Sequence, residues 1–125
     1  MTPEELTTGL RKWTQGHDLH VRAAVELLIS HGYWLHRDDF AAACTETFRG
    51  ETSIDWTHAR EFAEEAPGCS TLQRRLLLLA AAIGGDDFGL SKTSDQDAKA
   101  IIRAVTTAVT GTDPEAAGNA GRDQR

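Results

Sequence analysis

The sequence is poor in the residues that build disulfide frameworks and membrane spans. Its two cysteines, Cys44 and Cys69, form no Cys-x-x-Cys pair, so we expect both thiols to be reduced and structural. The longest apolar run, residues 76–83, is far shorter than the roughly 20 residues that cross a bilayer. The first residues are acidic with no apolar stretch behind them, which predicts no secretory signal and no membrane partner. We therefore expect a cytoplasmic protein.

Sequence motifs for catalysis and cofactor binding are also missing. There is no Gly-x-Ser-x-Gly turn, and the glycine pair at 84–85 is followed by Asp86 and Asp87, whose charge repels phosphate. His17 and His20 can share a helical face, but no further ligands at zinc-binding spacing accompany them. We expect no catalytic residue, no metal and no cofactor, and hence a protein that is not an enzyme.

What is present is an ordinary globular composition. The 125 residues are 40% hydrophobic and 26% charged, which predicts one domain with a core of its own, over residues 1–110. From residue 111 to residue 125 the chain has no large apolar side chain, so this end is expected to be a disordered tail. The net charge is −6. Its acids concentrate in the middle of the chain, where residues 37–65 hold eight acids and three arginines.

Apolar residues recur at helical spacing in six segments, most of them preceded by a capping residue. The caps are expected at Thr2, Asp38, Asp55, Ser70 and Ser94. The predicted helices cover residues 3–14, 18–31, 38–48, 55–66, 70–84 and 94–109. The fold class that follows is all-α, a compact bundle of five to six short helices.

The helix over residues 70–84 is expected to be central, because it is apolar nearly all round. We predict that Leu72, Leu76, Leu79 and Ile83 form one buried stripe of it. The sixth helix is predicted to bury Ile101, Ile102, Val105 and Val109. Between helices, the connector 33–35 is expected in the core. Residues 52–54 and 87–91 have short β-favouring patterns, and their pairing would give one two-stranded β-ribbon.

The best function class from sequence is a protein–protein interaction module. Acids cluster at the start of the third helix and on the outer side of the fourth, where they would steer a basic partner. The candidate partner-binding residues are Asp38, Asp39, Glu61, Glu64 and Glu65. The simpler alternative is that these charges form only a solvated surface. A second copy of the chain is also a candidate partner, since a bundle with aromatic connectors can leave an apolar patch exposed.

The alternative function is DNA binding by a helix-turn-helix variant that uses the helix after Ser94. Lys92, Lys99 and Arg103 would then contact phosphates or bases. The connection before this helix is longer than the usual turn of three or four residues. Asp95 and Asp97 also occupy the start of the helix, where they would repel phosphate.

Residues 31–40, His-Gly-Tyr-Trp-Leu-His-Arg-Asp-Asp-Phe, carry a resemblance together with Ile54-Asp55-Trp56 and Arg74-Arg75-Leu76-Leu77. They resemble segments of small uncharacterised helical proteins of actinobacterial genomes and their phages, over most of residues 17–109. The excess of arginine over lysine is also typical of a GC-rich genome. The resemblance implies a cytoplasmic origin and a fold of its own, with no activity, ligand or site attached.

Overall fold

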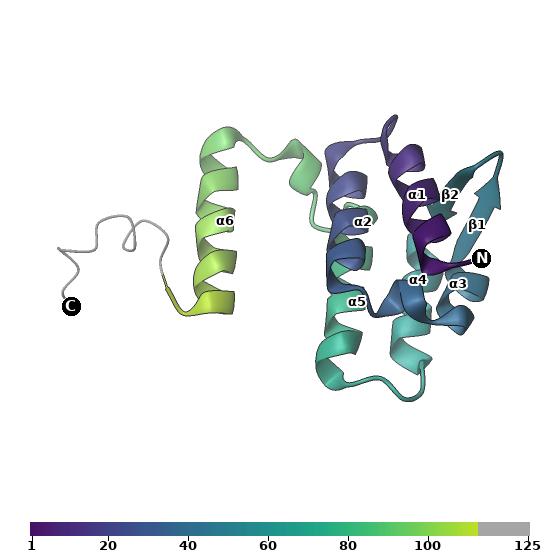
Figure 1. The fold of residues 1–125 in the computed structure, drawn as a ribbon. Helices are drawn as coiled ribbons and strands as arrows, with labels where there is room; N and C mark the ends of the chain where they lie inside the picture. The colour runs from purple at the N-terminus through teal and green to yellow at the C-terminus, as the bar shows by residue number, and fades with distance from the viewer. Residues whose placement is uncertain (113–125) are drawn as a thin grey trace. The chain divides into compact units, whose positions relative to one another are not determined.

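The computed structural model describes residues 1–112, which form six α-helices, two short 3₁₀ helices and one antiparallel β-hairpin (Figure 1). The expected all-α class, with short helices and one small ribbon, is confirmed. Contacts divide the chain into two compact units, residues 1–91 and a unit that begins at Lys92. Within residues 1–112 no helix is long and apolar enough to cross a membrane. Residues 113–125 of the predicted tail lie outside the described part of the chain.

The first unit contains all the elements up to α5. In chain order these are α1 (Pro3–Thr14), α2 (Leu19–His31), the 3₁₀ helix η1 (Trp34–His36), α3 (Asp38–Cys44), β1 (Thr45–Phe48), β2 (Glu51–Ile54), α4 (Trp56–Glu65) and α5 (Thr71–Gly84). The 3₁₀ helix η2 (Leu90–Lys92) follows, and the second unit contains α6 (Asp95–Thr110).

Most helices begin at the capping residues that the sequence predicts. The hydroxyl groups of Thr2 and Ser70 each accept a hydrogen bond from the third residue of their helix, whose side chain accepts one in return. Asp55 and Ser94 also accept a hydrogen bond from a first-turn amide. Asp38 is different, because it is the first residue of α3 and not its cap.

Helix α5 lies between α2 and α4 and turns a face of mostly small side chains toward them. The buried residues of this face are Leu77, Ala80, Ala81 and Gly84. At Gly84 an added Cβ atom would stand 2.3 Å from Cε2 of the Trp56 ring. Small side chains are therefore needed here, because they let the neighbouring elements approach the helix backbone closely.

The predicted buried stripe of α5 is consequently wrong at two of its four residues. Leu72 and Leu79 are exposed, while Leu76 and Ile83 are half-buried. The helix was expected to be covered nearly all round, whereas the first unit fully buries only one face of it. The larger leucines lie on the other side because close packing between two helices selects alanine and glycine for the inner face.

Hydrogen bonds between side chains and backbone attach both ends of α5 to the rest of the first unit. At its start, Nε1 of Trp34 donates to the Gln73 carbonyl at 2.9 Å, and the guanidinium of Arg74 donates to the carbonyl groups that end α4. At its end, Nδ1 of His20 lies 3.2 and 3.1 Å from the carbonyl oxygens of Ile83 and Gly84. Since carbonyl groups only accept, this nitrogen carries the proton.

Aromatic rings fill the centre of the first unit. Trp34 and Phe40 are fully buried, and the ring of Phe62 lies 6.1 Å from the first and 5.7 Å from the second, centroid to centroid. Leu35 is also buried, so the expectation that the connector 33–35 lies in the core is confirmed, with Tyr33 half-buried at its edge.

The third helix is shorter than predicted because residues 45–48 form a strand. This strand, β1, pairs with β2 in an antiparallel register that sets Thr45 opposite Ile54 and Phe48 opposite Glu51. The loop between them consists of Arg49 and Gly50, with φ of 55° and 83°, as a two-residue type I′ hairpin requires. Threonine favours a strand over a helix interior.

The predicted ribbon between residues 52–54 and 87–91 is therefore wrong in its pairing. Residues 52–54 pair with β1 instead. The other segment continues a turn that begins at residue 85 and leads into η2, and Asp86 and Gly89 have positive φ there. The Asp86 carboxylate closes this turn by accepting hydrogen bonds from the backbone amide and the hydroxyl group of Ser91.

The second unit by itself does not supply the burial expected for its helix. No residue of α6 is buried, and Ile102, Val105 and Val109 are more than half exposed, with Ile101 at 37%. These four lie along one side of the helix, as the sequence spacing predicts. The amphipathic pattern is thus present, and among the described residues of this unit no other element covers its apolar side.

A close approach between α1 and β2 gives the first testable prediction. At Gly9 an added Cβ atom would stand 2.2 Å from Oγ1 of Thr52, which is itself buried. We expect Gly9→Ala to lower the free energy of unfolding by about 1–3 kcal/mol, as measured by urea denaturation. Gly16→Ala is the matched control, because nothing lies within 4 Å of its Cβ position. Equal midpoints for the two variants would contradict this packing.

Candidate functional site

The structure places the predicted acidic residues on two neighbouring helices. Asp38 and Asp39 form the first turn of α3, and the three glutamates lie in the second half of α4. The two helices are in contact. All five carboxylates are exposed; we call Asp38, Asp39, Glu61, Glu64 and Glu65 the acidic surface.

Arg37 connects the two parts of the acidic surface. Its guanidinium donates to both carboxylate oxygens of Asp39, with Nε 2.9 Å from Oδ1, and also to the Pro67 carbonyl at 2.9 Å. Its Cζ atom lies 5.7 Å from the centre of the Phe62 ring on α4. The same guanidinium lies over the rings of Tyr33 and Trp34. It therefore ties the start of α3 to the end of α4.

This ion pair separates Asp39 from the other acids. The hydrogen bonds from Arg37 hold the pKa of Asp39 below its ordinary value, and those from Asp39 raise the pKa of Arg37. By contrast, Asp38 and the three glutamates have no hydrogen-bond or ion-pair partner within residues 1–112. The part of the acidic surface that is open to a basic partner is thus Asp38, Glu61, Glu64 and Glu65.

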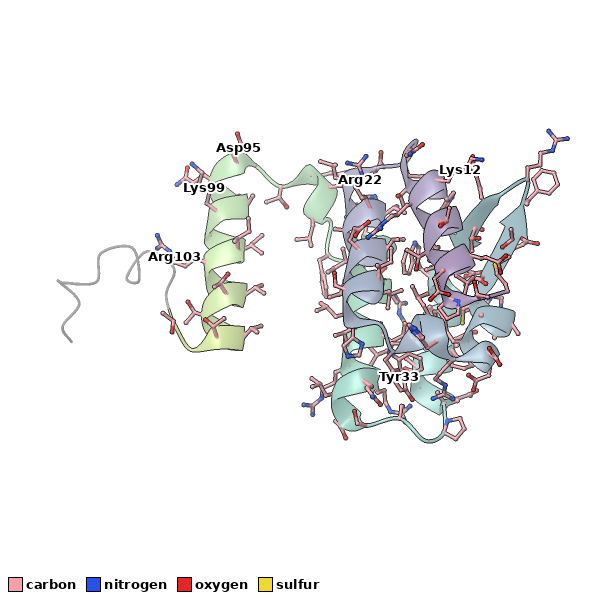
Figure 2. The ribbon with its side chains drawn as sticks, in the orientation of Figure 1. Lys12, Arg22, Tyr33, Asp95, Lys99 and Arg103 are labelled. Carbon is pink, nitrogen blue, oxygen red and sulfur yellow. The ribbon has the colours of Figure 1, made fainter. Side chains whose placement is uncertain are left out.

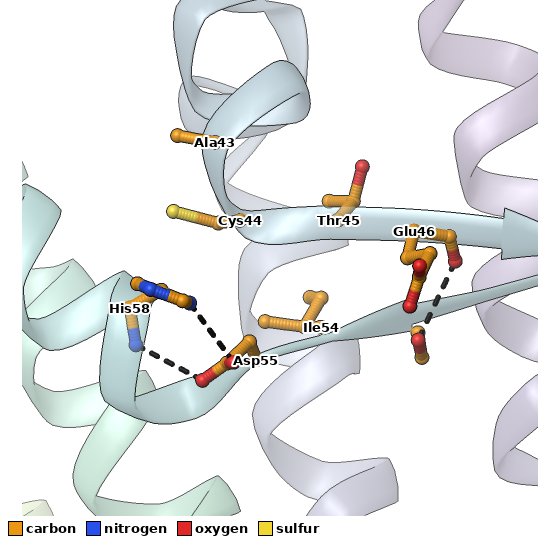
Figure 3. A pocket seen from close by; sticks show the side chains of 8 residues that line it. Ala43, Cys44, Thr45, Glu46, Ile54, Asp55 and His58 are labelled. Atoms are coloured by element: carbon orange, nitrogen blue, oxygen red, sulfur yellow. Dashed lines mark hydrogen bonds and ion pairs between the residues drawn. The ribbon is translucent and has the colours of Figure 1, made fainter.

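A hollow of about 410 Å³ lies where α3, the hairpin and α4 meet (Figure 3). Nδ1 of His58 lies 2.9 Å from Oδ2 of Asp55, and Cys44 lines the same hollow. A carboxylate that orients an imidazole beside a thiol is an arrangement that nucleophilic catalysis uses. The residue types of this hollow are therefore those of a catalytic site.

The thiol in this hollow is in the wrong state for a nucleophile. Cys44 is buried, and burial, together with the charges of Asp55 and Asp39, raises its pKa to about 12. Because the thiolate is the reactive form, the Cys44 thiol is protonated and inert near neutral pH. Asp55 has another role: it caps α4 by accepting from the His58 amide, which lowers the pKa of Asp55.

His17 and His20, the two histidines that the sequence places on one helical face, contact other groups and not each other. His20 binds the carboxyl end of α5, and the His17 ring packs 4.9 Å from the ring of Trp13. Within residues 1–112 no group of three histidine, cysteine or acidic side chains is placed to hold a metal ion.

The basic residues of the DNA-binding alternative lie at the beginning of the second unit and on its helix. Lys99 and Arg103 extend from the same side of α6, one turn apart, and Asp95 lies in the first turn (Figure 2). Lys92 ends η2. The segment between α5 and α6 runs from residue 85 to residue 94 and contains η2, so it is longer than a helix-turn-helix turn.

Comparison of the chain with protein-family models, with curated proteins and with solved structures finds no match. The residues themselves must therefore carry any functional argument.

Two features of the site region were missed from the sequence. One is the position of Arg37 among aromatic rings; the adjacent aromatic and acidic residues in positions 33–39 were a usable signal for it. The other is the leucine-rich outer side of α5, because the sequence pattern predicts that these leucines are buried. The sequence signal for an exposed apolar side was that the predicted helix has apolar residues on more than one side.

The Arg37–Asp39 pair predicts a specific acid sensitivity. Because the folded pKa of Asp39 lies below its unfolded value, the pair stabilises the fold above about pH 4 and loses this effect as the pH falls through the folded pKa. Asp39→Asn should thus lower stability at pH 7 and flatten its decline below about pH 4, measured by thermal melting. Asp38→Asn is the control and should keep the wild-type pH profile. Identical profiles for all three proteins would exclude this role of the pair.

The state of Cys44 can be measured by alkylation. We expect iodoacetamide at about pH 8 to modify Cys69, which is half-buried, much faster than Cys44. Mass spectrometry of peptides from the folded protein gives both rates. Faster modification of Cys44 than of Cys69 would contradict this account and would indicate that the hollow holds a reactive thiol.

Proposed function

We propose that the protein is a non-enzymatic interaction module, and that it binds a protein partner through the apolar side of α6. The observation that carries this proposal is that α6 buries none of its residues within its own unit, although its large apolar side chains share one side. Isolated helices of this length are only marginally stable in water, and most helices depend on packing of their apolar side. A partner surface would supply that packing.

The spacing on α6 suits a hydrophobic groove. Ile101, Val105 and Val109 recur every fourth residue, and Ile102 lies beside them. Such anchors are the usual pattern when an amphipathic helix binds in a groove of its partner. The opposite side carries Lys99 and Arg103 and would remain in water. The partner chemistry that fits is therefore an apolar groove on another protein, met in the cytoplasm.

The acidic surface is assigned a supporting role in this proposal. Four exposed carboxylates without partners within residues 1–112 create a local negative potential. Charges of this kind raise the rate of encounter with a basic protein more than they raise affinity.

The proposal predicts that one α6 substitution abolishes partner capture and a nearby one does not. Val105→Glu places a charge on the apolar side, so tagged protein carrying it should lose the partner that wild type captures from nuclease-treated native lysate. Lys99→Glu changes the polar side and should retain it. Both positions are exposed, and helix content checked by circular dichroism keeps folding separate from binding. Capture that survives Val105→Glu, or that depends on Lys99 alone, would contradict the proposal.

DNA binding by α6 is the second candidate, favoured by the shared side of Lys99 and Arg103. Such contacts depend strongly on salt. Duplex DNA titrated at low salt should then bind wild type and fail to bind Lys99→Glu. No binding at low salt would end this alternative, and binding unaffected by Lys99→Glu would place the contact elsewhere.

A further inference from the structure

Helix α5 has two apolar sides, of which the first unit buries one fully and the other only in part. The inner side packs between α2 and α4. On the outer side, Leu72 is 69% exposed and Leu79 is 46% exposed. Leu76 and Ile83 are half-buried, and Leu76 also packs against the core. We call Leu72, Leu76, Leu79 and Ile83 the leucine seam. A helix needs one apolar side for its own fold, so the second one requires another explanation.

The spacing of the leucine seam is that of a helix that pairs with another helix. Its members follow one another after four, three and four residues, which is the a and d pattern of a coiled-coil contact. At 100° per residue they fall within a sector of roughly 60°. This sector lies away from Leu77, whose side chain is fully buried in the core.

We propose that the leucine seam is the contact between two copies of this chain, related by a two-fold axis with their α5 helices antiparallel. About the midpoint between Leu76 and Leu79, antiparallel pairing sets Leu72 against Ile83 of the partner subunit. It also sets Leu76 against Leu79 of the partner subunit. The seam is thus complementary to itself, and each contact is made twice, as two-fold symmetry requires.

The charges on α5 favour a second copy in this orientation. Arg75 lies in its first half, which contains no acid, whereas Arg74 beside it is bound to carbonyl groups of α4. Asp86 and Asp87 lie just beyond its end, where Asp87 pairs with Arg60. Antiparallel pairing therefore points the basic half of each helix toward the negative carboxyl end of the other. Arg75 is exposed and has no hydrogen-bond or ion-pair partner within residues 1–112. Parallel pairing would instead align the arginines of the two copies.

The length of α5 sets the strength of the expected dimer. Its 14 residues span about 21 Å, so a contact along one helix falls at the small end of specific protein interfaces. Interfaces of that size are weak, which predicts a dimer that dissociates in the micromolar range.

Sedimentation velocity over micromolar to millimolar concentrations tests this proposal. Wild type should change from monomer to dimer, and Leu72→Glu or Leu79→Glu should weaken dimerisation at least about tenfold, because each buries a charge twice in the dimer. Phe48→Glu is the matched control: Phe48 is 70% exposed on the hairpin, and the variant should dimerise as wild type does. Unchanged urea midpoints would show that the Leu72 and Leu79 variants remain folded.

Arg75→Glu tests the orientation. It should raise the dissociation constant of the dimer several-fold. Lys12→Glu on α1 is the control and should leave this constant unchanged, because Lys12 lies beside the hairpin turn and not on α5.

A wild-type protein that stays monomeric, or a dimer that persists in both leucine variants, would overturn the proposal. A dimer that tightens in Arg75→Glu would overturn the antiparallel orientation. The function proposed for α6 is tested separately by Val105→Glu, which changes α6 and no residue of the leucine seam and should leave dimerisation unchanged. Failure of one proposal is thus distinguishable from failure of the other.

Discussion

The attachment of α5 at both ends is the constraint on which the first unit depends. Trp34 donates to the backbone at the start of the helix, and His20 binds the backbone at its end. These bonds, together with the small side chains of the inner side, determine which side of α5 enters the core. The leucine seam then has to lie outside. A structural feature of the fold thus creates the surface that we assign to association.

Helix positions were predictable from the sequence, because caps and terminators act locally. Thr2, Asp55 and Ser70 start helices where expected, and Gly32, in the left-handed conformation, ends α2. The side of a helix that is buried was harder to predict. For α5, hydrophobicity alone favours the leucines, whereas close contact with Trp56 favours Gly84. Such contacts are non-local, as is the pairing of β1 with β2.

The candidate site was predicted in its residue types and less well in its chemistry. The acids at 38–39 and 61–65 do lie on neighbouring helices, yet Asp39 is paired with Arg37, which spacing alone did not reveal. The hollow near Cys44 shows the converse: its residue types suggest catalysis, but burial keeps the thiol protonated. In both cases the surroundings of a side chain decide its role more than its identity does.

The central claim is that α5 stabilises the fold with one side and associates with the other. Leucine-methyl NMR spectra of the selectively labelled full-length protein, recorded over a dilution series, test it most directly. We expect the methyl signals of Leu72 and Leu79 to shift with concentration, while those of the buried Leu77, Leu10 and Leu28 stay fixed. Signals that are all independent of concentration, or shifts confined to the buried leucines, would contradict the account.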